Sequence, residues 1–272
     1  MTAEALTPQD AGADSEPILS LRGIQKSFGA VHVLRGVDLE VHRGRVTALV
    51  GDNGAGKSTL IKGIAGIHGF DEGEYLFEGR PVTVHGPRDA NALGIEVVYQ
   101  DLALCDNLDV VGNMFLGREH LTRLHTLDEN SMETLARQAL DSLSVTTIRS
   151  ARQLVASLSG GQRQTVAIAK AVLWQSKIVI LDEPTAALGV AQTAQVLDLV
   201  RRLAEQGVAV ILVSHNMNDV LRVADSIAVL FLGRTAAQVR RAEVTQTQVV
   251  ELITTGRSGA LGLSPTQAGA TL

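Results

Sequence analysis

The chain has 272 residues and a hydrophobic content of 45%, which suits one large or two small globular domains with a sizeable core. Its 24 Lys and Arg against 29 Asp and Glu leave a net charge of −5, which argues against nucleic-acid binding as the main role. A single cysteine, Cys105, excludes an internal disulfide framework and fits a reducing compartment.

The sequence contains no candidate membrane span. Its longest apolar runs, Ile178–Leu181 and Val208–Val213, are of strand length and fall far short of the roughly 18 residues that a span requires. The N-terminus is acidic and does not resemble a signal peptide, so we expect any membrane association to run through a partner. Residues 1–16 are predicted to form a disordered tail, and residues 257–272 a loose one.

The first hundred residues predict short strands separated by turns. The expected strands are Ile18–Ile24, Val31–Val41, Val46–Val50, a hairpin of Glu74–Phe77 with Val82–Val84, and Ile95–Tyr99, which ends at Gln100.

A glycine-rich stretch, GDNGAGKST at Gly51–Thr59, follows the strand Val46–Val50 and precedes a predicted helix at Leu60–Ala65. It satisfies the pattern G-x-x-x-x-G-K-[ST] of phosphate-binding loops. A glycine-rich turn that binds nothing is the alternative, and the strand–loop–helix context disfavours it.

The residue types in this stretch suit a nucleotide phosphate. Gly54 and Gly56 have no side chains, so backbone N–H groups can surround an anion at the positive end of the helix. Lys57 is expected to reach the β- and γ-phosphates, and the Ser58 hydroxyl to ligate Mg²⁺.

From about residue 101 to 160 the signals become helical, and we predict an inserted helical subdomain. Its apolar residues are spaced by polar ones: Met114, Phe115, Leu124, Leu127, Leu135, Leu140 and Leu143.

Strand signals resume at Ile178–Leu181, Val208–Val213 and Ile227–Leu232. A helix at about Ala191–Glu205 joins the first two, and its apolar stripe is Val196, Leu199, Val200 and Leu203. This alternation predicts a parallel sheet covered by helices.

The strand Ile178–Leu181 ends in two acids, Asp182 and Glu183. Downstream of a phosphate loop, Asp182 is expected to hold Mg²⁺, and Glu183 to orient a water for attack on the γ-phosphate. Without the phosphate loop, such a pair would more often mark a solvated turn.

A second glycine pair lies in LSGGQ, at Leu158–Gln162, before a predicted helix at Arg163–Leu173. Ser159 and the two glycines predict an anion site at a helix N-terminus. Within one subunit it would have no phosphate of its own to bind, because the phosphate loop already holds the nucleotide. A flexible linker is the alternative.

The stretches GDNGAGKST, Gln100, LSGGQ, ILDEP and His215 occur in one order. Over about residues 18–256 the chain thereby resembles the nucleotide-binding subunit of ATP-binding cassette (ABC) transporters. The resemblance implies an α/β P-loop NTPase fold: a mainly parallel sheet core, an antiparallel β subdomain and an inserted helical subdomain, in a single domain over residues 17–256. It also implies binding of ATP and Mg²⁺, and ATP hydrolysis.

The resemblance assigns roles that the residues alone would not. Gln100 matches the glutamine that touches Mg²⁺ or the attacking water, His215 the histidine that contacts the γ-phosphate, and Phe28 the aromatic that stacks on adenine. Ser159–Gln162 match the signature loop, which closes on the nucleotide held by the other subunit. Taken singly, Gln100 is a polar strand end, His215 a cap and Phe28 a core residue.

The candidate catalytic residues are Lys57, Gln100, Glu183 and His215. The candidate nucleotide-binding residues are Phe28, Gly51, Asp52, Asn53, Gly54, Ala55, Gly56, Lys57, Ser58, Thr59, Gln100, Ser159, Gly160, Gly161, Gln162, Asp182 and His215. The candidate Mg²⁺ ligands are Ser58, Gln100 and Asp182.

One position departs from the family pattern. After ILDEPT the family usually has S/A-x-L-D, whose Asp lies at the dimer interface, whereas here Gly189 follows Ala186-Ala187-Leu188. A carboxylate that helps couple two ATP sites is therefore missing. Hydrolysis is still expected, with its rate and the coupling left open.

The stretches Gln100–Leu104 and Asn113–Glu119, with Gly51–Asn53 and Ala186–Val190, resemble the ATPases of bacterial monosaccharide importers of the ribose, xylose and fructose type. Many of those carry two cassettes in one chain, and this chain has one phosphate loop. The resemblance therefore implies a head-to-tail homodimer, with integral-membrane permease subunits and, indirectly, a sugar-binding protein as partners, and no nucleic acid. It places the chain at the cytoplasmic face of the bacterial inner membrane.

Three alternatives stay open at this point. The chain could energise transport of another solute, such as an amino acid or a lipid; it could be a soluble ABC ATPase that acts on nucleic acid or ribosomes; or it could be a nucleotide-binding regulator without turnover. Pairing with a different cassette is also open, and the solute is not named by the sequence.

Overall fold

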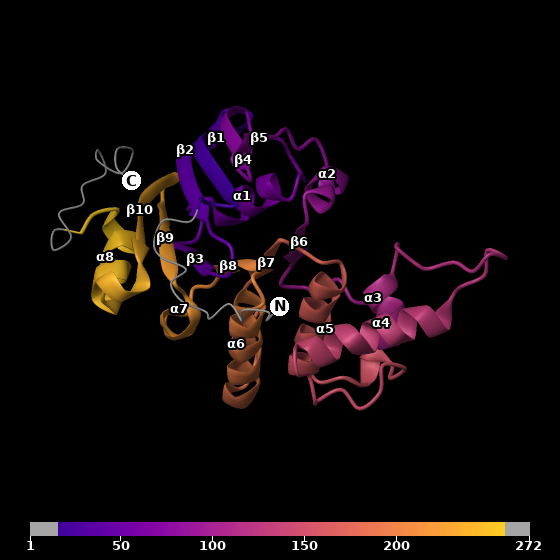
Figure 1. Ribbon diagram of the computed structural model, residues 1–272. Helices are drawn as coiled ribbons and strands as arrows, with labels where there is room; N and C mark the ends of the chain where they lie inside the picture. Colours follow the sequence, from indigo (N-terminus) through magenta and orange to yellow (C-terminus); the bar gives the residue numbers. More distant parts are fainter. Residues whose placement is uncertain (1–15, 259–272) are drawn as a thin grey trace, which may run out of the picture.

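The structure is a computed structural model, and it describes residues 16–258. The predicted tails, 1–16 and 257–272, lie almost wholly outside the described residues. Two β-sheets and a group of helices make up the described chain (Figure 1).

The first sheet is antiparallel, with strand order β2-β1-β4-β5. Its strands are β1 (Leu19–Phe28), β2 (Val31–Val41), β4 (Glu72–Phe77) and β5 (Arg80–Pro81). β1 runs four residues further than predicted, because its last residue, Phe28, still pairs with Val31. This sheet is the expected antiparallel β subdomain.

The prediction for the second strand of the hairpin is wrong. We expected it at Val82–Val84, but β5 begins directly after a two-residue turn of Glu78 and Gly79. Both turn residues have positive φ, 50° and 71°, as the tightest hairpin turns require. The strand therefore starts and ends earlier than its apolar residues suggest.

The second sheet has the order β10-β9-β3-β8-β7-β6. Its strands are β3 (Val46–Gly51), β6 (Ile95–Val98), β7 (Ile178–Asp182), β8 (Ala209–Val213), β9 (Ser226–Phe231) and β10 (Arg234–Arg240). All neighbouring pairs are parallel except β9 and β10. The central strands are buried along nearly their whole length, as a sheet covered on both faces requires.

Eight α-helices and two short 3₁₀ helices fall within the described residues. They are α1 (Lys57–Ile64), α2 (Pro87–Ala92), α3 (Val110–Phe115), α4 (Glu129–Ser142), α5 (Gly160–Leu173), α6 (Val190–Glu205), α7 (Met217–Val223) and α8 (Gln246–Thr255), with 3₁₀ turns at Val155–Ser157 and Arg241–Glu243. Figure 1 shows α3, α4 and α5 gathered beyond the β6 edge of the large sheet, and α8 at the opposite edge beside β9 and β10.

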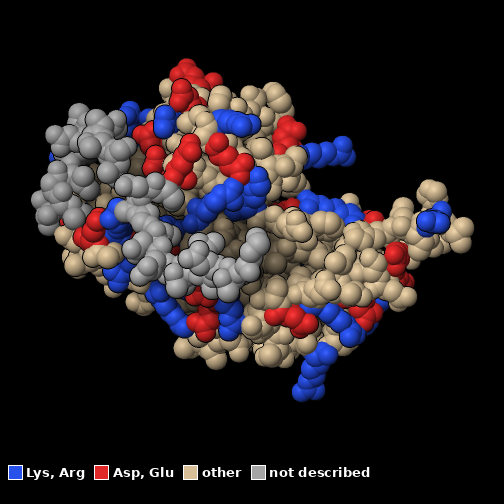
Figure 2. Space-filling view, viewed as in Figure 1, with Lys and Arg blue, Asp and Glu red and all other residues tan. Residues whose placement is uncertain are grey.

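The predicted helical segment is partly right. Phe115, Leu140 and Leu143 are buried in one core with α5 and α6, but Leu124 and Leu127 are 85% and 52% exposed. These two residues lie in a turn between α3 and α4, where the Thr122 N–H donates to the Thr126 carbonyl (2.8 Å). The turn forms a projecting arm, which Figure 2 shows as mostly uncharged beside a surface of interspersed acids and bases.

The apolar stripe of α6 is buried as predicted: Val196, Leu199, Val200 and Leu203 are at most 3% exposed. α1 packs Leu60, Ile61 and Ile64 into the core that joins the two sheets. At the outer edge, β2 and β10 are linked by side chains, since the Glu40 N–H donates to Gln238 Oε1 (3.0 Å) and Gln238 Nε2 donates to the Glu40 carbonyl (2.6 Å). The two sheets are thereby joined at this edge.

Across residues 16–258, every helix is too short or too polar to cross a membrane.

Candidate nucleotide site

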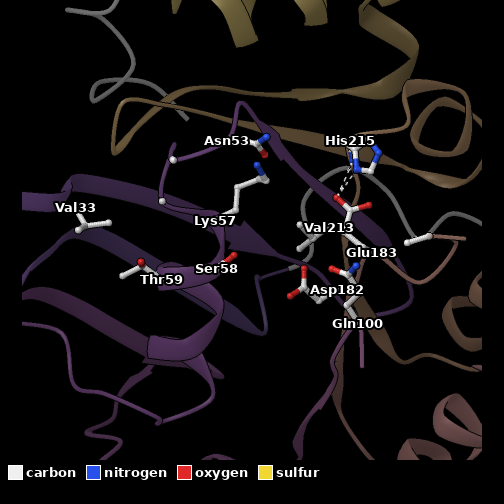
Figure 3. A pocket seen from close by; sticks show the side chains of 13 residues that line it. Val33, Asn53, Lys57, Ser58, Thr59, Gln100, Asp182, Glu183, Val213 and His215 are labelled. Atoms are coloured by element: carbon white, nitrogen blue, oxygen red, sulfur yellow. Dashed lines mark hydrogen bonds and ion pairs between the residues drawn. The ribbon is translucent and has the colours of Figure 1, made fainter. Parts of the chain in front are cut away.

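Three adjacent parallel strands, β3, β8 and β7, end at the same edge of the large sheet. The residues after their carboxyl ends meet around one cavity of about 390 Å³ (Figure 3), which is where open α/β sheets bind ligands. The cavity is lined by Val33, Asn53, Gly54, Gly56, Lys57, Ser58, Thr59, Gln100, Asp182, Glu183, Ala186, Val213 and His215.

The phosphate loop is already curled around its own lysine. Gly54 and Gly56 have φ of 80° and 104°, values that favour glycine, and they turn the chain into the first residues of α1. Lys57 Nζ donates to the carbonyls of Gly51 (2.7 Å) and Asp52 (3.0 Å), so the ammonium lies inside the loop. A phosphate that enters this loop would meet that ammonium and the free N–H groups of the helix.

Burial moves the charged groups of the cavity toward their neutral forms. It lowers the pKa of Lys57, against the raising effect of Glu183, Asp52 and Asp182. It raises the pKa of Asp182, and the negative charge of Glu183 raises it further, with Lys57 among the opposing charges. A half-buried carboxyl that is held near a second carboxyl is a site where a cation relieves repulsion.

The residues present fit Mg²⁺ as a partial site. Ser58, Gln100 and Asp182 bring oxygen atoms, which this ion prefers, to the same cavity (Figure 3). Among the described residues, no cluster of three or more His, Cys, Asp or Glu could hold an ion unaided. Waters and nucleotide phosphates would therefore have to complete the shell, as is usual for Mg²⁺.

Glu183 is held by the residue that faces it. Its backbone has a φ of 50°, and its N–H donates to the Val213 carbonyl (2.9 Å). Its Oε1 accepts a hydrogen bond from the His215 N–H (3.1 Å) and lies 2.8 Å from His215 Nδ1 (Figure 3). The carboxylate is 16% exposed and the imidazole 76%, so His215 lies on the open side of the cavity.

Phe28 lies outside this cavity, at the end of β1. Its ring meets His68 edge-on, with 5.3 Å between centroids, and Lys26 Nζ lies 5.4 Å from the centroid of the Phe28 ring. Phe28 is 49% exposed, so part of its surface is open to a ligand. The predicted stacking role is compatible with that exposure.

The signature loop is likewise separate from the cavity. Ser159 caps α5, with its N–H donating to Gln162 Oε1 (2.9 Å) and its hydroxyl accepting from the Gln162 N–H (3.4 Å). Ser159, Gly160, Gly161 and Gln162 are all described, and none of them lines the cavity. The phosphate-loop residues Gly51, Asp52 and Ala55 are not among those that line the cavity either.

Sequence reasoning missed three residues that line the cavity: Val33, Ala186 and Val213. Val33 comes from β2 of the other sheet, and no local pattern indicates that contact. It also missed Asp219 of α7, a buried carboxylate that accepts a hydrogen bond from Thr185 Oγ1 (2.7 Å) just after Glu183.

Residues 34–186, more than half of the chain, match the family model described as ABC transporter. The chain belongs to the ABC transporter family. The matched segment begins in β2 and ends at Ala186, so it contains the phosphate loop, Gln100, the signature loop, and Asp182 and Glu183 at the end of β7.

This ABC cassette has relatives of similar length. It is 43% identical to the xylose/arabinose import ATP-binding protein of Sulfolobus acidocaldarius, over 90% of this chain and 97% of the relative. It is 44% identical to the fructose import ATP-binding protein of Rhizobium meliloti, over 88% and 94%. The ribose import ATP-binding protein of Caldanaerobacter subterraneus is 39% identical, but the cassette spans only 48% of that chain.

Solved structures confirm the predicted fold class. A nucleotide-free ATP-binding cassette from an ABC transporter superposes with a TM-score of 0.74 at 28% identity, over 87% of this chain and 98% of that one. The ADP conformation of another such cassette gives a TM-score of 0.74 at 27% identity, over 89% and 96%. The ABC cassette thus has the fold that its motifs predict.

Proposed function

We propose that this chain is the ATP-binding and ATP-hydrolysing subunit of an importer for a monosaccharide. The observation that carries the proposal is the cavity in which Lys57 of the phosphate loop faces the acids of β7 (Figure 3). Membership of the ABC transporter family and full-length similarity to sugar import ATP-binding proteins support it.

The residues divide the work of phosphoryl transfer to water. Backbone N–H groups of the loop and Lys57 bind the β- and γ-phosphates. Ser58, Asp182 and Gln100 would hold Mg²⁺, which would neutralise charge on the phosphate oxygens. Glu183 orients the attacking water and accepts its proton, and ADP leaves in line with that water. Since Glu183 and His215 are in contact, His215 must release the carboxylate when it turns to the γ-phosphate.

The site is completed by a second copy of the chain. The signature loop, Ser159–Gln162, lies outside the cavity of its own subunit, so it is free to close on the nucleotide of a partner. Because the chain has one phosphate loop and one signature loop, a head-to-tail homodimer gives two equivalent sites. Phe28 adds the stacking surface for adenine, beside the phosphates.

The transport role requires partners that this chain does not supply. Integral-membrane permease subunits would hold the dimer at the cytoplasmic face of the bacterial inner membrane, and a sugar-binding protein would deliver the solute to them. The relatives named for xylose/arabinose, fructose and ribose import support a pentose or hexose as that solute.

Phosphate release by the purified chain tests the enzymatic part. Glu183→Gln keeps the shape of the side chain but removes the base, so we expect ATP binding to persist and turnover to fall by about 10²- to 10⁴-fold. A variant that hydrolyses ATP as fast as the parent would contradict the role of Glu183.

Uptake of labelled xylose, arabinose, fructose and ribose tests the solute class. Cells that carry Glu183→Gln in place of the parent should lose uptake of at least one of these sugars. Unchanged uptake of all four, together with lost uptake of an amino acid or a lipid, would show that the solute class is wrong. Co-purification with ribosomes or DNA instead of a permease would overturn the transport role.

A further inference from the structure

Gly189 stands where the family usually has a carboxylate, and the structure shows what holds this turn instead. Gly189 is the N-cap of α6, and its N–H donates to Oε1 of Gln192 (3.2 Å), three residues into the helix. A glutamine at that position that returns to the cap N–H is half of a capping box. The turn is thus fixed by an amide of its own helix.

The same glutamine touches the signature helix. A Cβ atom placed on Gly161 would lie 3.1 Å from both Cβ and Cγ of Gln192, and one placed on Gly160 would lie 3.3 Å from Cδ2 of Leu188. Contacts this short leave no room for a side chain at Gly161 unless Gln192 moves. The first turn of α5 therefore rests directly on the start of α6.

The chain between Glu183 and this contact forms a hydrogen-bonded turn. The Ala186 N–H donates to the Glu183 carbonyl (3.1 Å), and the Leu188 N–H donates to the Thr185 carbonyl (3.3 Å). Ala187 has a φ of 60°, which holds the chain in a tight turn. A displacement of Gln192 can therefore reach the catalytic acid through this hydrogen-bonded turn.

We propose that Gln192 is a positioning residue that joins the signature loop to Glu183 of the same chain, in place of the absent carboxylate at Gly189. The inference rests on the proposed function, in which the signature loop serves the partner's ATP while Glu183 acts on its own. Gln192 thereby connects the two ATP sites of the dimer by packing and one hydrogen bond instead of by charge.

Three variants separate the contribution of packing from that of the hydrogen bond. Gln192→Ala removes both the packing carbons of the side chain and the oxygen that accepts from the Gly189 N–H. Gln192→Leu keeps packing carbons without the accepting oxygen, and Gln192→Glu keeps both. Gln195→Ala, at an exposed residue one turn along α6, is the matched control. The rate of phosphate release is measured as a function of ATP concentration. Each rate is divided by the amount of folded protein, which circular dichroism gives, and ATP binding is measured separately.

We expect positive cooperativity in ATP, with a Hill coefficient clearly greater than about 1, for the parent, Gln192→Glu and Gln195→Ala. Gln192→Ala should lower kcat by about two- to thirtyfold, the range for residues that alter coupling, and bring the Hill coefficient to about 1. Gln192→Leu should fall between them, and ATP affinity should not change, because Gln192 lies outside the cavity.

A Hill coefficient of about 1 in the parent, or one that Gln192→Ala leaves unchanged, would overturn this inference while leaving hydrolysis intact. A parent chain that releases no phosphate at all would contradict the proposed function, and the inference with it.

Discussion

The Asp182 carboxylate lowers the stability of the nucleotide-free chain, although it is a candidate ligand of Mg²⁺. Burial and the neighbouring charge of Glu183 raise its pKa above the ordinary value. A carboxyl with a raised folded pKa binds its proton more tightly in the folded state, so the free energy of unfolding falls as the pH rises from the unfolded to the folded pKa. The penalty is complete once the pH lies above both values.

Asp182→Asn should therefore raise the melting temperature of the nucleotide-free chain at pH 7 while removing Mg²⁺-dependent hydrolysis, a trade that is common at active sites. The difference in melting temperature should shrink as the pH falls through the raised pKa. Thermal unfolding of both proteins over a pH series measures this. A variant that is less stable than the parent at pH 7 would show that Asp182 is held by favourable contacts.

Phe28 offers a ring that is half exposed, and stacking of a base on an aromatic ring is worth about 1–3 kcal/mol. Phe28→Ala should weaken ATP binding by that amount and change kcat little, because the ring lies outside the cavity. Phe28→Trp, which keeps a stacking surface, is the control. Equal Kd values for the parent and Phe28→Ala would rule out adenine stacking.

At the scale of elements, the central parallel sheet could be predicted from the sequence because its strands are buried on both faces and read as apolar runs. β3, β7, β8 and β9 were all placed within one or two residues. α2, α7, β10 and α8 had no prediction, since α2 and α7 have at most seven residues and β10 and α8 carry weaker patterns. Leu124 and Leu127 show the opposite failure, because apolar residues in an exposed turn imitate a buried stripe.

The motifs of the site can be predicted from the sequence, but the contacts between them cannot. The phosphate loop and the two acids, Asp182 and Glu183, follow from local chemistry, because each motif is contiguous in the chain. A strand runs directly into the glycines and the lysine in the first, and into the two carboxylates in the second. The contact of Glu183 with His215 joins residues 32 positions apart, and Val33 reaches the cavity from another sheet. Such contacts depend on tertiary packing, which no local pattern encodes.

Gly54 and Gly56 of the phosphate loop allow a matched comparison. A Cβ on Gly56 would lie 2.8 Å from Cδ2 of Leu34, whereas one on Gly54 would meet no atom within 4 Å, and both residues have positive φ. Gly54→Ala should cost about 1–3 kcal/mol of stability from backbone strain, and Gly56→Ala more, because Leu34 must also move. Urea unfolding of both variants measures this, and a less stable Gly54→Ala would contradict the packing assigned to Leu34.

At the scale of the whole molecule, we propose that one ATP site is built from two copies of the chain. The phosphate loop and the acids of β7 line one cavity, while the signature loop caps α5 away from it. In the proposed dimer, a nucleotide held in that cavity would lack the second anion site until a partner supplied it. Hydrolysis would thereby require closure of the dimer, which is the motion that a permease can use.

Complementation between two inactive variants tests this claim most directly. Lys57→Ala removes the phosphate contact, and Ser159→Arg blocks the signature loop at an exposed residue. In an equal mixture, random pairing makes half of the dimers mixed, each with one intact site, so phosphate release should recover to about a quarter of the parental rate. Each variant alone should stay near background. A mixture as inactive as its components would contradict a site shared between two copies.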